Sequence, residues 1–228
     1  MNKHLLLSLL FCLGSFSTFA QTQLWFNGAV KAHPADFTYP KGISGDYNNL
    51  PIFNLAIGAD TRLKKSLWYF NYALSYNYVE SRLNMGTGFI LTDLGLVKTN
   101  ENAYYVESIN LIGVKAGFSP LYRINRKGRS ISLPFGVQGY IPIFSKGFTQ
   151  IGDTRLGMRS IYTGDDFKYA VFYGIYFRPT YQFKLTENQR SPWSFGVYTE
   201  GDLLILNEGA TNPKWTAGGG LEVRYRLK

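Results

Sequence analysis

The sequence predicts an all-β fold, namely an eight-stranded antiparallel up-and-down transmembrane β-barrel with a filled polar lumen. Two observations carry this prediction. The closing residues alternate apolar and polar side chains up to the last position, as a strand between lipid and a polar interior requires. Aromatic residues make up 17% of the chain. No segment after residue 20, however, has the ~18 consecutive apolar residues of a transmembrane helix.

The first 20 residues have the features of a secretory signal peptide. A basic start at Lys3 precedes the apolar run 5–13, and small residues lead to Ala20, after which we expect cleavage. The only cysteine, Cys12, lies inside this leader. The expected mature chain, residues 21–228, is a single domain without disulfides, thiolate catalysis or cysteine metal ligands.

The first three strands are predicted at residues 23–33, 50–62 and 66–80. Aromatic and aliphatic side chains occupy every second position in each segment, with polar side chains between them. A loop rich in Pro, Gly and Asn separates the first two strands, and a tight turn at Lys64 and Lys65 joins the second to the third.

The fourth strand, residues 104–118, has an ambiguous pattern. Ile112 keeps the parity of the outward apolar row, whereas Ile109 and Leu111 have the opposite parity. A β-bulge near Asn110 is predicted, because one extra residue would bring both sets to one face.

The next three strands are predicted at residues 130–143, 168–184 and 193–206. Pro134 and Pro142 each remove a hydrogen-bond donor from the first of these strands.

The closing strand, residues 215–228, has the clearest alternation. Its polar row includes the four charged residues Glu222, Arg224, Arg226 and Lys228, and its apolar row runs from Trp215 to Leu227. The alternatives are a strand of a soluble sandwich or of a soluble lipocalin-type barrel. A lipocalin-type barrel would be apolar inside and polar outside, the inverse of the predicted rows.

The connections alternate long and short, which predicts the orientation in the membrane. Long polar loops are expected outside the cell at 81–103 and 145–167, and short turns, including the basic turn 119–129, in the periplasm. Residues 89–97 are apolar enough to extend a strand beyond the membrane.

The whole mature chain resembles small outer-membrane β-barrel proteins, both the OmpA/OmpX-like eight-stranded barrels and the porin-family or PorT-like β-barrel domain group. The C-terminal pattern Gly220, Val223, Tyr225 and Leu227 is similar to the signal that the barrel assembly machinery recognises in this group, although Lys228 stands where an aromatic residue is usual. The resemblance implies an outer-membrane location in the cell envelope and contact with lipid and lipopolysaccharide. It implies little about activity.

The inward charges are expected to neutralise one another, because a buried unpaired charge is very costly. Glu200 and Asp202 lie one strand away from Arg224 and Arg226, so pairing between these two strands is predicted. A proton or ion pathway and a catalytic carboxylate are the alternatives. The predicted lumenal ion-pair network consists of Asp60, Arg62, Lys115, Arg178, Glu200, Asp202, Glu222, Arg224 and Arg226.

Catalytic and metal sites have little support in the sequence. His33 is the only histidine after the leader, and no recognisable motif joins it to the serines and aspartates of the neighbouring loops. One histidine without cysteine argues against a transition-metal site. Acidic turn residues such as Asp153 are expected to be solvated rather than to hold calcium. No catalytic residue, metal or cofactor is predicted.

The predicted function is therefore a non-enzymatic integral outer-membrane β-barrel that acts as a structural or interaction protein, including an accessory subunit of a secretion or envelope assembly complex. Loops 81–103 and 145–167 or the basic turn 119–129 are the expected contacts for a protein partner, and nucleic acid is not expected for an exported chain. The alternatives are a narrow carrier for a small or hydrophobic ligand and a lipid A-modifying barrel enzyme.

Overall fold

The computed structural model describes eight stretches of the chain, which are residues 22–32, 47–63, 66–92, 95–124, 129–159, 171–184, 191–206 and 214–227. The expected signal peptide and His33 lie outside these residues. Within the described residues, no helix is long and apolar enough to cross a membrane.

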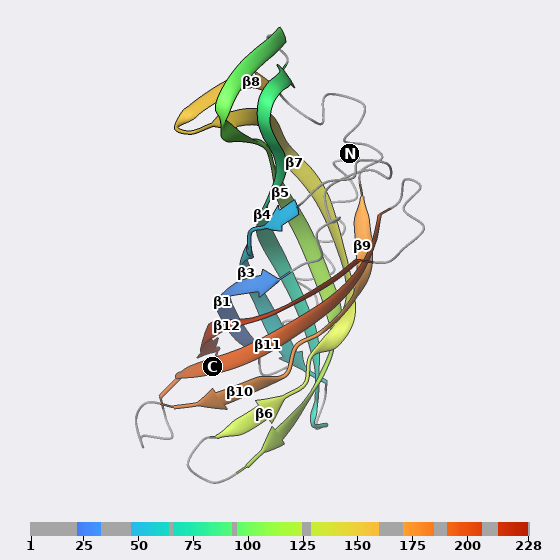
Figure 1. Cartoon of the computed structure of the whole chain (residues 1–228). Helices are drawn as coiled ribbons and strands as arrows, with labels where there is room; N and C mark the ends of the chain where they lie inside the picture. The colour runs from blue at the N-terminus through green and yellow to red at the C-terminus, as the bar shows by residue number, and fades with distance from the viewer. Residues whose placement is uncertain are drawn as a thin grey trace.

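Eight strands of the described residues close into an antiparallel ring (Figure 1), as the sequence predicts. Each strand pairs with the next, and the last pairs with the first. The order is β1 (Thr22–Ala32), β3 (Ile52–Arg62), β4 (Trp68–Thr92), β5 (Gly95–Arg123), β7 (Phe135–Ile151), β9 (Phe172–Phe177), β11 (Trp193–Leu206) and β12 (Lys214–Arg226).

Two short strands complete the wall at the lower end of the barrel. β6 (Ser130–Ser132) continues the line of β7 beyond Pro134, and β10 (Thr180–Phe183) continues that of β9 beyond Pro179. The prolines interrupt the strands because they lack an N–H donor, but their carbonyls still accept hydrogen bonds. Arg178 N donates to Pro134 O at 2.8 Å, and Thr199 N donates to Pro179 O at 3.1 Å. The wall therefore stays closed at these positions.

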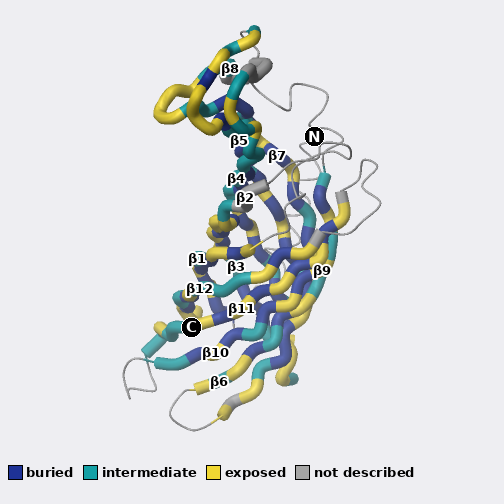
Figure 2. The backbone as a smooth tube through the Cα atoms, in the orientation of Figure 1, coloured by how far each residue is buried: buried dark blue, intermediate teal, exposed yellow. Residues whose placement is uncertain are grey.

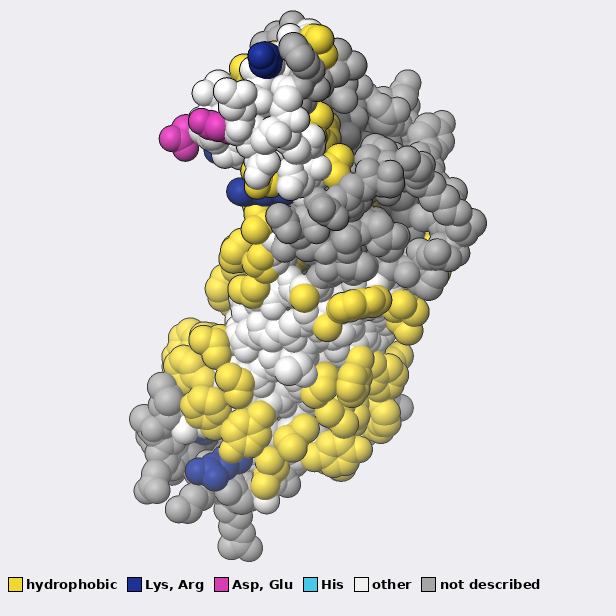
Figure 3. All heavy atoms as spheres, viewed as in Figure 1, with side chains coloured by type: hydrophobic (Ala, Val, Ile, Leu, Met, Phe, Trp, Pro, Cys, Tyr) yellow, Lys and Arg dark blue, Asp and Glu magenta, His cyan; other side chains and the backbone are white. Residues whose placement is uncertain are grey.

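The two faces of the wall differ in polarity as predicted, because successive side chains of a strand point to opposite sides. Buried and exposed residues alternate along the barrel strands (Figure 2). The exposed side chains form an apolar belt (Figure 3), whereas Asn27, Asn54 and Ser75 face the lumen and are buried. An apolar outer belt around a polar lumen is the arrangement of a membrane-spanning barrel.

A β-arm rises beyond the barrel where long loops are predicted (Figure 1). β4 and β5 remain paired up to Thr92 and Gly95, so residues 81–103 are mostly strand rather than loop. Residues 145–151 continue β7, and β8 (Thr154–Arg159) folds back on it. β2 (Tyr47–Asn49) pairs with β4 at the base of this arm. The predicted strand extension at 89–97 lies at its tip.

The predicted bulge is present, but it has a different role. The register between β5 and β7 shifts at Asn110 and Leu111, and the extra residue, Ile143, belongs to β7. Ile109 and Leu111 therefore do not rotate outward but are buried. The expectation that a bulge brings them to the outer face is wrong.

Candidate functional site

A first ion-pair cluster lies in the lumen near the turn end of the barrel, which we define as the end that carries the β3–β4, β5–β6 and β10–β11 connections. Arg224 of β12 contacts both Asp60 of β3 and Glu222 of its own strand. Arg178 lies 3.5 Å from Glu222, between Nη2 and Oε2. Trp25 donates from Nε1 to Asp60 Oδ1 at 3.1 Å. Polar and aromatic side chains thus hold the cluster in place.

Arg178 also packs against aromatic rings that face the lumen. Its guanidinium carbon lies 4.1 Å from the centroid of the Trp25 ring and 5.5 Å from that of Tyr198. A guanidinium over an aromatic face gains cation–π attraction, and a desolvated site strengthens this attraction.

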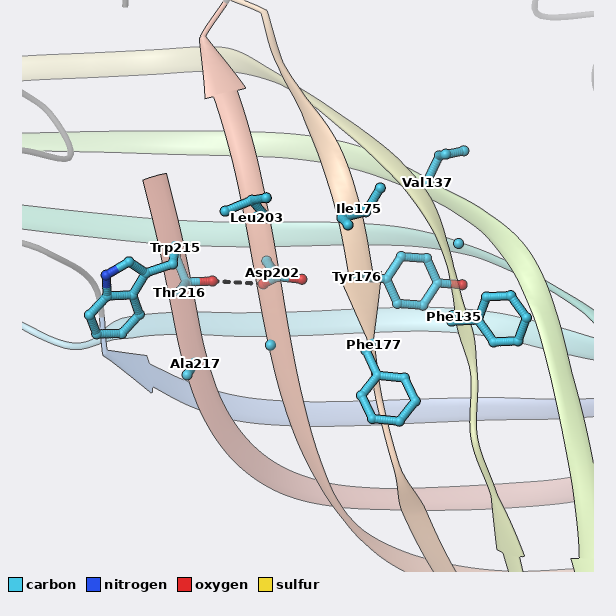
Figure 4. Close-up of a pocket in the computed structure, with 12 residues that line it drawn as sticks. Phe135, Val137, Ile175, Tyr176, Phe177, Asp202, Leu203, Trp215, Thr216 and Ala217 are labelled. Atoms are coloured by element: carbon cyan, nitrogen blue, oxygen red, sulfur yellow. Dashed lines mark hydrogen bonds between the residues drawn. The ribbon is translucent and has the colours of Figure 1, made fainter. Parts of the chain in front are cut away.

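A second cluster lies further along the lumen. Lys31 contacts Glu200 and donates to Asp202 Oδ2 at 2.6 Å, while Lys115 contacts the same Glu200 oxygen as Lys31, Oε1. Thr216 donates to Asp202 Oδ2 at 2.7 Å (Figure 4). Each carboxylate therefore has a cationic partner.

The charges of the two clusters balance. The two clusters together hold four cations and four carboxylates, all between 1% and 6% exposed. Equal numbers in contact allow every charge to be buried next to an opposite one, which burial of ions requires. The eight residues are Lys31, Lys115, Arg178, Arg224, Asp60, Glu200, Asp202 and Glu222.

The structure places seven of the nine predicted network residues in these clusters. Arg62 is half-buried and donates from Nε to Ser66 O at 2.9 Å, and Arg226 is exposed, so neither belongs to the network. The predicted partners of Glu200 and Asp202 are also wrong, because both carboxylates contact Lys31 rather than Arg224 or Arg226.

The predicted network does not include Lys31. Its inward parity on the first strand was a usable signal, since it shares a face with Trp25 and Asn27. The register explains its partner. Lys31 and Glu200 both lie opposite Gly218 of β12, which has no side chain to separate them. The ion pair therefore spans two strand intervals rather than one.

An apolar layer closes the lumen beyond the second cluster. It consists of Ile52, Val79, Ile109, Leu111, Tyr140, Phe172 and Leu204. Tyr140 joins the layer to the polar residues by donating to Gln138 Oε1 at 2.9 Å, and Gln138 in turn donates to Asp202 at 2.9 Å. The space between layer and cluster is about 10 Å³, about the volume needed for one water.

A larger groove, about 710 Å³, lies on the outer surface across β7, β9, β11 and β12. Exposed apolar side chains including Val137, Ile175, Leu203 and Trp215 line it (Figure 4). Gly201 leaves it open, because a Cβ there would meet nothing within 4 Å. The groove is thus part of the apolar belt.

The remaining candidate residues are scattered. Within the described residues, no group of three or more His, Cys, Asp or Glu is placed to hold a metal ion. Asp153 is exposed beside Gly152, whose φ of 53° suits the tight turn between β7 and β8. Gly220, Val223 and Tyr225 lie on β12, and Leu227 follows it, but their role in assembly stays a prediction.

No protein-family model matches the chain, and no curated protein matches its sequence. Several solved structures are similar to the chain in fold, with TM-scores between 0.29 and 0.44 for five of them. Neisserial surface protein A is 8% identical, with 90% of this chain and 97% of that chain covered and a TM-score of 0.44.

Two further structures have similar coverage. Ail of Yersinia pestis, in complex with the heparin analogue sucrose octasulfate, is 9% identical. The match covers 91% of this chain and 99% of Ail, with a TM-score of 0.39. The N-terminal β-barrel domain of Pseudomonas aeruginosa OprF is 13% identical. The match covers 90% of this chain and 99% of that domain, with a TM-score of 0.40.

Proposed function

We propose that the protein is a non-enzymatic integral outer-membrane β-barrel that acts as a structural or interaction protein, as an accessory subunit of a secretion or envelope assembly complex would. The observation that carries this proposal is the filled lumen. The balanced charge clusters and the apolar layer occupy the interior of the described barrel, which leaves its outer surfaces and its two ends for function.

The arm is the surface that we assign to a protein partner. In its tip, β4 residues 88–92 pair with β5 residues 95–99 and with no other strand of the described chain. A two-stranded hairpin is at best marginally stable in water, and open strand edges are ready to pair with another chain. A partner that adds a strand would pair along an edge of this hairpin. The arm would then be stabilised by the complex in which it takes part.

Deletion of residues 86–99 tests this assignment. The shortened protein is expected to keep the barrel, because the lumen clusters and the ring pairings lie outside the deleted segment. It is expected to lose a partner that co-purifies stoichiometrically with the full chain from detergent-solubilised outer membranes. Retention of the barrel is read from the heat-dependent shift in electrophoretic mobility.

A matched control replaces turn residues 125–128 with Gly and Ser. This variant should retain the partner, because the turn is at the opposite end of the barrel. A full-length barrel that purifies alone after cross-linking would contradict the proposal, as would a partner that remains bound after the arm is deleted.

The non-enzymatic part of the proposal has its own test. His33 is the only residue after the leader with an unperturbed pKa near neutrality, so a lipid A enzyme would need it as general base. His33→Ala is expected to leave the lipid A mass spectrum of a producing strain unchanged. A change in acylation that depends on His33 would instead establish an enzyme.

A further inference from the structure

In the sequence, the excess positive charge falls in the segments that connect the strands of the turn end and in the C-terminal residues. By sequence, this end carries eleven Lys and Arg residues against one acidic residue, Glu187. Three of the cations lie in residues 62–65, four in 123–129, two in 184–190 and two in 226–228. The lumen is balanced, and the arm end, with the remaining long loops, carries eight Lys and Arg against ten Asp and Glu. The net charge of +9 for the whole chain thus comes from the turn end, together with Lys3 of the expected leader.

The described cations of this end border the aromatic margin of the apolar belt. Arg226 follows Tyr225, whose ring lies 4.8 Å from that of Trp193. Lys184 follows Phe183, and Arg62 lies at the barrel rim at the level of the exposed Trp68, although its register partner Tyr69 faces the lumen. Lys and Arg side chains are visible directly below the apolar belt (Figure 3). Trp and Tyr prefer the level of lipid head groups, so these cations reach the same level.

Three cations of this end, all within the described residues, have no ionic partner there. No carboxylate there pairs with Arg62, Arg129 or Arg226. Partial burial and, to a smaller extent, the positive charge of Arg226 lower the pKa of Lys184, so these two cations lie near each other. Like charges held together at a membrane surface favour binding of an anion from outside the protein.

We infer that the turn end is a binding surface for the phosphate groups of anionic phospholipids in the leaflet that surrounds it. This inference rests on the proposed membrane location. Cations at head-group depth attract anionic lipid by about fivefold in affinity per residue. The position beside the aromatic margin favours lipid over a soluble acidic protein, because a lipid phosphate lies at that depth already.

The test uses the full-length protein in detergent with equimolar phosphatidylglycerol and phosphatidylcholine, and native mass spectrometry measures which lipid stays bound. The wild-type protein is expected to retain phosphatidylglycerol preferentially, and Arg62→Gln, Arg129→Gln and Arg226→Gln together should reduce this preference at least about fivefold. Excess inorganic phosphate should not displace the lipid, since it lacks the acyl chains that the belt contacts.

The matched control neutralises three cations of the arm, by Lys98→Gln, Lys146→Gln and Arg155→Gln, and should keep the wild-type preference. Equal retention of the two lipids by the wild-type protein would overturn the inference, as would an equal loss in the control. Loss of an acidic protein partner from the turn-end variant, without any change in lipid preference, would also overturn it. Insertion of all three proteins into vesicles, measured separately by heat-dependent mobility, tests the membrane proposal independently of lipid preference.

Discussion

Lys31 shows how single residues hold the lumen together. It lies between two carboxylates of β11 and is 2% exposed. Removing it would leave Asp202 without an ionic partner among the described residues, although Gln138 and Thr216 would still donate to it. An uncompensated buried charge destabilises a protein far more than the intact pair stabilises it.

Lys31→Met is therefore expected to lower the free energy of unfolding by about 3–5 kcal/mol. Adding Asp202→Asn should recover part of this loss, because it removes the carboxylate that Lys31 neutralised. Urea unfolding in lipid vesicles of Lys31→Met, Asp202→Asn and the double variant gives the coupling energy of the pair. Arg226→Gln, at an exposed site outside the clusters, is the control and should stay within about 0.5 kcal/mol of wild type. Strictly additive effects of the two lumen substitutions would rule out the proposed pairing.

Gly218 has an equally specific place, at the point where Lys31 and Glu200 meet. A Cβ at this position would lie 2.1 Å from Val30 O and 2.6 Å from the Cα of Lys31. Backbone atoms of β1 cannot move aside as a flexible side chain can, so a methyl group would force the two strands apart.

Gly218→Ala is accordingly expected to destabilise the barrel by about 1–3 kcal/mol, the usual cost of overpacking. Gly201→Ala is the matched control, because its methyl group would enter open space in the outer groove. It should change stability by less than about 0.5 kcal/mol. Unfolding midpoints of the two variants, measured side by side in vesicles, test the close approach. Equal stability of the two would argue against it.

Which side chains face the lumen could be predicted from sequence, but which of them meet could not. Parity alone places Trp25, Asn27 and Lys31 on one face of the first strand. The stagger between strands decides which inward residues share a level, and no local pattern encodes it. For this reason Glu200 was assigned to Arg224 on the neighbouring strand, whereas its partner Lys31 lies two strands away.

At the scale of elements, the arm marks the limit of the periodicity argument. Residues 81–103 contain Gly86, Gly88 and Gly95, and glycines in such a segment usually indicate turns or loops. In the structure, these glycines take positive φ values of 77°, 109° and 112° within or at the ends of paired strands. Register shifts at Gly86 and Gly88 show that they bend the hairpin rather than end it. A bulge glycine and a turn glycine are indistinguishable without the partner strand.

Proteolysis of intact cells tests which way the arm points. Trypsin should cleave after the exposed Lys98 in the arm, whereas the basic turn 119–129 should stay protected, because the short turns are expected in the periplasm. Mass spectrometry of the released peptides identifies the sites, and permeabilised cells provide the control in which the turn is also cleaved. The reverse pattern on intact cells would invert the proposed orientation.

At the scale of the whole molecule, the fold class could be predicted because it depends on repetition. Eight segments can form a ring when each has an apolar row of side chains that faces outward. In the structure, β12 closes this ring on β1, from the pair Gln23↔Arg226 to the pair Ala32↔Ala217. The lumen contents were less predictable. Ile109 and Leu111 were expected to face lipid, yet they belong to the apolar layer that caps the charges. An apolar residue can satisfy either environment, so its identity alone does not decide its face.

Because charge clusters and an apolar layer fill the described lumen, we expect the barrel to conduct no ions and to act through its outer surfaces and its ends. Single-channel recording across a planar bilayer tests it most directly, with insertion checked beforehand by heat-dependent mobility of the same sample. We predict no conductance steps for the wild-type protein, because the neutral clusters and the apolar layer fill the described lumen. The combined substitutions Ile109→Gly, Leu111→Gly and Tyr140→Gly remove three large side chains of the layer and should produce leak currents. A stable conductance from the wild-type protein would contradict the account.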